Sequence, residues 1–264
     1  YTKLKMIGET AFCGCNALKT LTLPASLKVI RNHAFYQCHT LTTLTLPVNL
    51  KSIGIGAFAE CNALTTLTLP ANLTSIGIGA FSGCKALKTL DLSKCTNLTS
   101  IGETAFYQCH TLKTLTLPAN LTSIGINAFN GCKALTKLTL PVNLKSIGIG
   151  VFSGCDTLET LDLSNYTKLK MIGETAFCGC NALTNLTLPA NLKVIGNHAF
   201  YQCKALTKLT LPENLKSIGK GAFEGCKALT ELTIPDKLTN IGNKAFEGCN
   251  ALTTLTLPTR FNTV

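Results

Sequence analysis

Cysteine is the residue type in this sequence whose number and spacing most strongly invite a chemical role. The 264 residues include 14 cysteines, and eleven of them stand three positions after a phenylalanine. Evenly spaced thiols can ligate a metal, form disulfides or supply a nucleophile. The eleven regularly spaced cysteines are Cys15, Cys38, Cys61, Cys84, Cys109, Cys132, Cys155, Cys180, Cys203, Cys226 and Cys249.

Neither metal binding nor disulfide bonding fits this spacing well. A zinc site calls for Cys-x-x-Cys pairs accompanied by histidine, whereas Cys13 and Cys15, like Cys178 and Cys180, are separated by a single residue. Cysteines at equivalent places of stacked repeats could lie about 5 Å apart, but their side chains would point the same way. We therefore predict a buried column of small apolar thiols and no metal ion. Cys13, Cys95 and Cys178 lie outside this column and are predicted to be exposed.

The histidines and glycine pairs offer no alternative catalytic centre. The four histidines fall in predicted turns, and no nucleophile or carboxylate accompanies them at a fixed spacing; they are His33, His39, His110 and His198. Residues 54–56 read Gly-Ile-Gly, but a phosphate-binding loop needs a strand before it and a full helix after it. We predict a protein without catalytic residues or a cofactor, and not an enzyme.

These residues sit in a repeat that runs through the whole sequence. Its phenylalanines are 23 residues apart, except at two links of 25 residues, where the usual proline is missing (residues 92–98 and 163–169). The eleven phenylalanines are Phe12, Phe35, Phe58, Phe81, Phe106, Phe129, Phe152, Phe177, Phe200, Phe223 and Phe246. A unit of this size cannot bury its own apolar face, so we expect the repeats to stack into a single solenoid over residues 1–264.

Apolar alternation predicts one strand in each repeat. In residues 18–24, Leu21 and Leu23 alternate with threonines, which is the period of a strand with one buried face. Pro24 then ends the strand, because it has no N–H to donate to a neighbouring strand.

The rest of the repeat is predicted to be a second extended segment and a tight turn. Residues 50–54 show the second segment, whose isoleucine is followed by glycine in ten of the eleven units, Arg31 being the exception. A recurring glycine indicates either positive φ or close approach of another backbone segment. Residues 57–61 are predicted to form one 3₁₀ or α turn that carries Phe58 and Cys61 inward.

Residues 41–61 match without a gap the repeating frame Leu-x-x-Leu-x-Leu-Pro-x-x-Leu-x-x-Ile-Gly-x-x-Ala-Phe-x-x-Cys. This frame resembles the BspA-like class of leucine-rich repeats. The resemblance implies a curved, right-handed, mainly β leucine-rich repeat solenoid. It would have a parallel concave sheet, one strand per repeat, with short extended segments and 3₁₀ or α turns on the convex side. The resemblance also implies an extracellular, microbial cell-surface protein that adheres to host matrix proteins or cells. It implies no ligand-contacting residue, because the positions that the family shares are structural.

The outward strand positions carry the question of function. Most are threonine, which suits a ladder of neighbouring hydroxyls and gives little specificity. A concave sheet is where solenoids commonly bind partners, so the charged exceptions on the concave strand face are the candidate partner-binding residues. They are Lys88, Asp91, Lys113, Lys137, Glu159, Asp162, Lys208 and Glu231. The leading hypothesis is a non-enzymatic adhesion module for a protein of the host matrix or cell surface.

Three alternatives stay open. The chain could be a structural spacer that displays another domain. It could bind acidic polysaccharide, because the net charge is +11 and residues 1–150 hold 13 basic and 4 acidic residues. The basic residues are scattered, however, which favours a solvated surface, and we do not expect nucleic acid binding. The threonine columns also resemble an ice-binding face, but the interrupting charges and the expected curvature make ice binding a poor fit.

The ends of the chain lead to two further expectations. No apolar run approaches the roughly 20 residues that span a membrane, so direct membrane insertion is not expected. The sequence begins partway through a repeat, and we expect a fragment of a longer surface protein. After Pro258 the repeat stops, and Phe261 is expected to cover the last repeat. An open end would favour an end-to-end or edge dimer.

Overall fold

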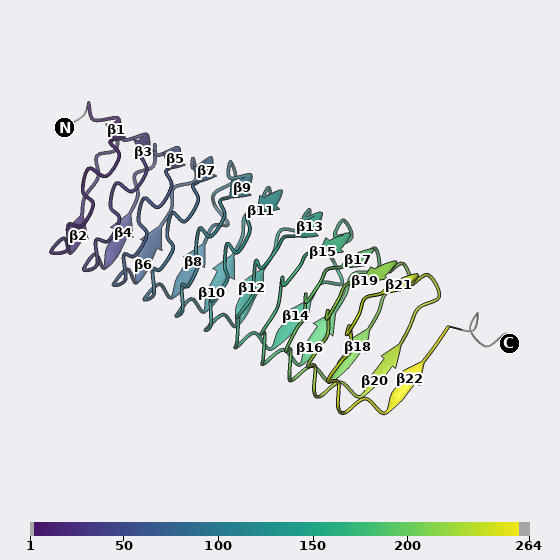
Figure 1. Ribbon diagram of the computed structural model, residues 1–264. Coiled ribbons are helices and arrows are strands. Elements are labelled where there is room, and N and C mark those ends of the chain that lie inside the picture. Colours follow the sequence, from purple (N-terminus) through teal and green to yellow (C-terminus); the bar gives the residue numbers. More distant parts are fainter. Residues whose placement is uncertain (1–2, 259–264) are drawn as a thin grey trace. The chain divides into compact units, whose positions relative to one another are not determined.

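The computed structural model describes residues 3–258. Contacts divide the chain into two compact units, Tyr1–Pro141 (unit 1) and Val142–Val264 (unit 2). Taken separately, each unit is a stack of rungs, and one repeat forms one rung. The strands of each unit succeed one another in chain order (Figure 1). No residue between 3 and 258 lies in a helix, so each unit is a parallel β-solenoid.

The Leu-Thr-Leu segments form one set of strands, all parallel. In unit 1 they make two three-stranded sheets, β2 (Thr20–Leu21), β4 (Thr43–Thr45) and β6 (Thr66–Thr68), then β8 (Thr89–Asp91), β10 (Thr114–Thr116) and β12 (Lys137–Thr139). In unit 2 they make one five-stranded sheet of β14 (Thr160–Asp162), β16 (Asn185–Thr187), β18 (Lys208–Thr210), β20 (Glu231–Thr233) and β22 (Thr254–Thr256). These are the strands predicted from apolar alternation, and they span two or three residues each.

The second extended segments form the other set of strands, each two residues long and ending on isoleucine. In unit 1 they are β1 (Met6–Ile7), β3 (Val29–Ile30), β5 (Ser52–Ile53), β7 (Ser75–Ile76), β9 (Ser100–Ile101) and β11 (Ser123–Ile124). In unit 2 they are β13 (Ser146–Ile147), β15 (Met171–Ile172), β17 (Val194–Ile195), β19 (Ser217–Ile218) and β21 (Asn240–Ile241). We call the outward side of these strands the second face.

In-register pairing builds the core. Each strand residue pairs with its equivalent one repeat away, as Leu44 does with Leu67 and Ile30 with Ile53. Equivalent leucine, isoleucine, phenylalanine and cysteine side chains therefore lie in columns, and most of them are buried. Each buried leucine, isoleucine or phenylalanine contributes roughly 1.5–3 kcal/mol relative to an exposed side chain.

The phenylalanines form a stack in each unit. Neighbouring ring centroids lie 5.1 to 5.4 Å apart from Phe12 to Phe129 in unit 1. In unit 2 they lie 5.2 to 5.5 Å apart from Phe152 to Phe246. Such offset stacking adds about 0.5–1.5 kcal/mol per pair to the burial term. The prediction that Phe58 and Cys61 point inward is confirmed, since both are fully buried.

The turn before each cysteine is not the 3₁₀ or α turn that we predicted. Positive φ occurs twice in it, as at Gly56 (56°) and Glu60 (58°), and a right-handed helical turn cannot pass through such residues. The N–H groups of Gly56, Phe58 and Glu60 instead donate to carbonyl oxygens of the next rung over 2.7 to 2.8 Å. The N–H groups between them bond within the rung. Three hydrogen bonds in one direction therefore join adjacent rungs at this edge, which we call the turn edge.

Close approach to the preceding rung explains the glycine that follows the isoleucine in eight of the repeats. A Cβ on Gly54 would lie 2.6 Å from the carbonyl carbon of Arg31, and a Cβ on Gly196 would lie 2.6 Å from that of Gly173. Neither glycine has positive φ, which occurs two residues later in the repeat. Of the two explanations offered by the sequence, contact with the preceding rung is the correct one.

The first of the two longer links places a cysteine where other rungs have proline. Leu98 N donates to the Cys95 carbonyl over 3.0 Å, as Leu50 N does to Pro47 over 2.9 Å. The Cys95 thiol donates to the carbonyl of Pro70 at 3.5 Å, and Cys95 is 1% exposed. The prediction that Cys95 is exposed is therefore wrong, because the residue fills a core position and the two extra residues precede it.

Two expectations concern the chain as a whole and its last residues. That residues 1–264 form one uninterrupted solenoid, within a longer surface protein, stays a prediction. The expectation that Phe261 covers the last rung lies outside the described residues.

The glycine contact gives a direct test. We expect Gly196→Ala to lower the free energy of unfolding by about 1–3 kcal/mol, because the added methyl would overlap backbone atoms of the preceding rung. Urea unfolding followed by circular dichroism measures the change. Gly8→Ala is the matched control, since nothing lies within 4 Å of a Cβ at that glycine. Equal midpoints for the two variants would contradict the explanation.

Candidate functional site on the threonine face

The even-numbered strands from β2 to β22 present regular rows of threonine on their outward side. We call this side the threonine face. In β4, Thr43 and Thr45 are exposed while Leu44 between them is fully buried. Pairing of β4 with β6 sets Thr43 beside Thr66 and Thr45 beside Thr68. The prediction that leucines face the core and threonines face outward is confirmed.

A further row of threonines stands just before the strands and has a structural use. Thr65 Oγ1 donates to the carbonyl oxygen of Thr42 at 3.1 Å, and Thr184 Oγ1 to that of Glu159 at 3.1 Å. The same bond recurs at Thr42, Thr136, Thr230 and Thr253. These hydroxyls tie neighbouring rungs together, so this row is part of the scaffold as well as of the surface.

Four of the predicted partner-binding residues gather on three neighbouring rungs of unit 1. Lys113 N donates to the Lys88 carbonyl over 2.8 Å, and Lys137 N to the Lys113 carbonyl over 3.1 Å. Asp91 on β8 pairs with Thr116 on β10. All four charged residues are exposed, and three of them are cationic.

The other four lie in unit 2 and divide into two pairs. Glu159 immediately precedes β14 and Asp162 ends it, while Lys208 on β18 pairs in register with Glu231 on β20. The intervening strand β16 carries Asn185 at the equivalent position. Three of the four charges here are anionic, the reverse of the group in unit 1.

A hollow of about 310 Å³ lies over β18 and β20 on the threonine face. Its lining includes Lys208, Glu231, Thr210, Thr233 and Glu213. Lys208 and Glu231 do not form an ion pair with each other, unlike Lys244 and Glu247 in the same unit, so they do not neutralise each other by direct contact. Both charges remain available to a ligand in the hollow.

The two aspartates have a local structural use as well. Asp91 Oδ1 accepts a hydrogen bond from Ser93 N at 2.9 Å, and Asp162 Oδ1 accepts one from Ser164 N at 2.9 Å. Hydrogen bonds from these serines hold the pKa of each carboxyl below its ordinary value. Each aspartate thus closes the turn of a lengthened link, which gives the acidic residue a structural reason to be there.

The cysteine column is buried and its thiols are engaged. Cys61 Sγ donates to the carbonyl oxygen of Phe35 at 3.4 Å, and the same bond to the phenylalanine one rung back recurs along both units. The cysteines are free, as predicted for a column of small apolar thiols, although Cys15 in the first rung is only half-buried. Burial raises the pKa of Cys61, Cys109 and Cys226 to about 12. Such thiols are protonated at neutral pH and are not nucleophiles.

The cysteines outside the column differ from one another. Cys13 is exposed as predicted, and Cys178 is half-buried, with a pKa raised by burial. Within residues 3–258, no three histidine, cysteine or acidic side chains come together as metal ligands would.

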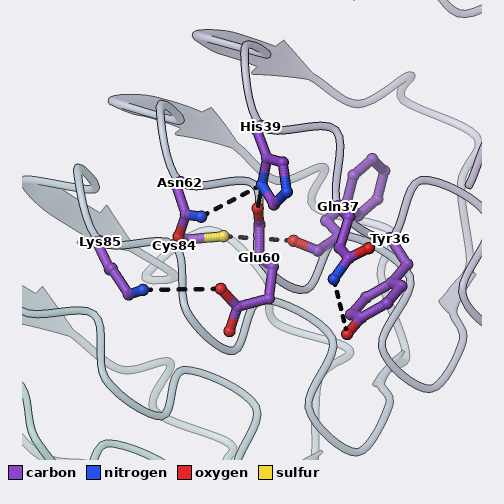
Figure 2. Close-up of polar contacts among 8 residues, drawn as sticks. Tyr36, Gln37, His39, Glu60, Asn62, Cys84 and Lys85 are labelled. Atoms are coloured by element: carbon purple, nitrogen blue, oxygen red, sulfur yellow. Dashed lines mark hydrogen bonds and ion pairs between the residues drawn. The ribbon is translucent and has the colours of Figure 1, made fainter. Parts of the chain in front are cut away.

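A polar cluster on the turn edge of unit 1 lacks the geometry of a catalytic centre (Figure 2). His39 Nδ1 lies 2.9 Å from the carbonyl oxygen of Glu60 and 3.3 Å from Asn62 Nδ2, and Lys85 Nζ lies 3.8 Å from the Glu60 carboxylate. The nearby Cys84 thiol donates to a backbone carbonyl at 3.4 Å instead of facing His39. Burial also raises the pKa of Cys84, so the cluster holds no histidine-activated nucleophile.

Sequence reasoning missed a charged row on the second face. Lys145, Lys170, Lys193 and Lys216 each follow the inward leucine by one position in four successive repeats. Their recurrence at the repeat spacing is the signal in the sequence that could have located them.

One known family matches almost the entire sequence. The model of the BspA type leucine-rich repeat region matches residues 2–98, 87–170 and 170–264. No curated protein matches the chain.

Solved structures share the fold. A leucine-rich repeat protein from Bacteroides ovatus is 29% identical, with a TM-score of 0.81, over 90% of this chain and 69% of that one. A T. pallidum leucine-rich repeat protein is 27% identical, with a TM-score of 0.55, over 72% of this chain and 78% of that one. The pneumococcal vaccine antigen PcpA is 20% identical, with a TM-score of 0.53, over 96% and 67% of the two chains, and shows the likeness of fold alone.

The buried thiols predict sensitivity to alkali. The folded state keeps Cys109 protonated up to about pH 12, whereas an unfolded thiol ionises near pH 9. Its contribution to stability is therefore complete below pH 9 and is lost as the pH rises toward 12, by up to about 1.4 kcal/mol per pH unit. We expect Cys109→Ala to flatten the fall of the urea midpoint between pH 9 and 11. Cys13→Ala, which removes an exposed thiol, should leave the wild-type slope; equal slopes for all three proteins would refute the prediction.

Proposed function

Because this chain belongs to the BspA-type leucine-rich repeat family, we propose that it is a non-enzymatic module that binds a protein partner through the threonine face. The family resemblance drawn from the sequence is thereby confirmed. Leucine-rich repeat solenoids generally serve as binding scaffolds, and their extended sheets supply the contact surface. The same proposal makes the partner a host matrix or cell-surface protein and places the chain outside the cell.

The observation that carries this proposal is the distribution of charge on the threonine face. In unit 1 the candidate group holds three lysines and one aspartate, and in unit 2 it holds three acidic residues and one lysine. Rows of uncharged threonine surround both groups. A partner with complementary acidic and basic patches would be selected by such a surface, because charge complementarity supplies specificity and rate of association.

Among residues 3–258 there is no helix of the length and apolar character that crossing a bilayer requires.

Charge removal on the threonine face tests the proposal. Two variants remove the charges of the two units separately. The first combines Lys88→Thr, Lys113→Thr and Lys137→Thr in unit 1. The second combines Lys208→Thr and Glu231→Thr in unit 2. Threonine occupies the equivalent positions of other rungs, so the fold should tolerate each change. We expect at least one variant to weaken adhesion to immobilised extracellular-matrix protein and to epithelial cells by about tenfold, which is the scale of one or two important contacts.

The control for the unit 2 variant removes the same charges elsewhere. Lys227→Asn with Glu224→Ser takes one cation and one anion from the turn edge of unit 2, using residues that other rungs carry there. Its adhesion should equal that of the wild type. Unchanged adhesion in both threonine-face variants would contradict the proposal and favour a structural spacer. The hydrogen bonds from threonine hydroxyls to carbonyl groups of the neighbouring rung support that alternative.

An end-to-end or edge dimer stays a prediction. Light scattering in solution measures the mass.

A further inference from the structure

The second face of unit 2 holds a groove that is lined along its length by a row of glycines. Between the strand residues and the residues after the glycines, the hollow measures about 630 Å³. Gly173, Gly196 and Gly219 line its floor, and their close approach to the preceding rung keeps that row free of side chains. We call it the glycine groove. Its size is within the range of small-ligand sites in proteins.

One wall of the groove continues directly into a row of lysines. Lys170, Lys193 and Lys216 immediately precede Met171, Val194 and Ser217, which line the groove. We call Lys145, Lys170, Lys193 and Lys216 the lysine column.

The lysine column is in register. Lys170 N donates to the Lys145 carbonyl over 2.9 Å, Lys193 N to the Lys170 carbonyl over 2.8 Å, and Lys216 N to the Lys193 carbonyl over 2.9 Å. Adjacent strands are about 4.8 Å apart, so the backbone positions of the four lysines recur at about that interval. Three of the lysines are exposed and Lys193 is half-buried.

The charges of the lysine column are uncompensated. None of the four lysines takes part in the ion pairs found within the described residues. The charged residues lining the glycine groove are Glu174 and Lys220, whose formal charges cancel. Like charges directly opposite one another on neighbouring strands destabilise a sheet.

The fold does not require these lysines. Thr74, Thr99 and Thr122 occupy the equivalent position in three successive rungs of unit 1, and Thr239 does so in unit 2. Threonine could therefore replace these mutually repelling lysines without loss of the fold. Their presence needs another reason.

We propose that unit 2 binds a linear acidic polysaccharide along its second face. The lysine column pairs with successive carboxylate or sulfate groups, and the sugar rings lie in the glycine groove. Hydroxyl and amide groups of Ser217, Asn197 and Asn240 line the groove and can hydrogen bond to sugar hydroxyls. This interaction is separate from protein binding on the threonine face and does not rest on it.

The lining favours polysaccharide over single-stranded nucleic acid. Sites for single strands combine a cationic groove with aromatic side chains on which bases stack. No aromatic residue lines the glycine groove among the described residues.

Unit 1 offers a less suitable version of the same surface. Lys5, Lys28 and Lys51 form a column of three. Arg31, however, stands where the groove floor has glycine, and its Nε lies 3.1 Å from Met6 Sδ. The acidic-polysaccharide alternative, which charge counting had assigned to residues 1–150, therefore fits unit 2 better.

The test compares two variants of the whole chain that lose four positive charges each. The first replaces the lysine column with threonine (Lys145→Thr, Lys170→Thr, Lys193→Thr and Lys216→Thr). The second, a control, removes four lysines elsewhere in unit 2 in favour of residues that other rungs carry (Lys204→Asn, Lys227→Asn, Lys237→Asn and Lys244→Thr). Equal urea midpoints would establish that both are folded.

Heparin, hyaluronan and poly(dT) are the probes, with calorimetry or interferometry at several salt concentrations. We expect the wild type to bind heparin and the column variant to bind it at least tenfold more weakly, with a shallower salt dependence because fewer counterions are released. The control should stay within about threefold of the wild type. Ser217→Tyr keeps the charge but fills the groove, and it should also weaken heparin binding about fivefold or more.

Several results would overturn the proposal. Equal losses in the column variant and the control would make net charge the cause, and absence of wild-type binding to heparin and hyaluronan would remove the site. Tighter binding of poly(dT), lost in the column variant, would assign the column to nucleic acid. Because the column variant leaves the threonine face intact, its adhesion to protein reports on the proposed function independently.

Discussion

In-register pairing sets each residue of a rung against its own counterpart one repeat away, and the remaining features of each unit depend on this constraint. Phenylalanine stacks on phenylalanine at 5.1 to 5.5 Å because the pairing permits no other partner. In eight of the repeats the same geometry brings the glycine after the isoleucine against the preceding backbone, where a Cβ would overlap it. A buried column therefore favours a side chain that packs well against a copy of itself. Small thiols, flat rings and glycine meet that requirement.

Much of the fold followed from the sequence because repetition turns weak local signals into strong ones. A single Leu-Thr-Leu-Pro predicts little, whereas its recurrence at 23 residues predicts strands, stacking and an inward face. The turn edge was harder to predict, since its conformation depends on hydrogen bonds to another rung. Thr104 has a φ of 50°, which β-branched residues rarely adopt, and no local pattern announces it. Cys95 was misjudged for a related reason: its neighbours in sequence resemble a loop, but its position in the rung is the proline position of the core.

The candidate site was less predictable than the fold. The sequence located the charged residues on the threonine face, and the structure added that Asp91 and Asp162 also close their own turns. Charge alone does not distinguish a residue kept for the scaffold from one kept for a partner. The comparison with equivalent residues in other rungs is more informative, because it shows what the scaffold accepts at the same place. By that measure, the lysines of the second face and the Lys208–Glu231 pair are additions to the scaffold.

The turn edge has one more physical consequence. In each unit its three hydrogen bonds per rung all run from an N–H toward the following rung, as those of Gly56, Phe58 and Glu60 do. Peptide dipoles aligned in this manner add up, as they do along an α-helix. The turn edge of each unit thus has electrical polarity, with donors directed toward one pole and acceptors toward the other, whereas N–H groups elsewhere in the rung, such as those of Lys51 and Gly54, donate to the preceding rung. Any surface that prolonged this ladder would have to join it head to tail, because two like poles would bring donors against donors.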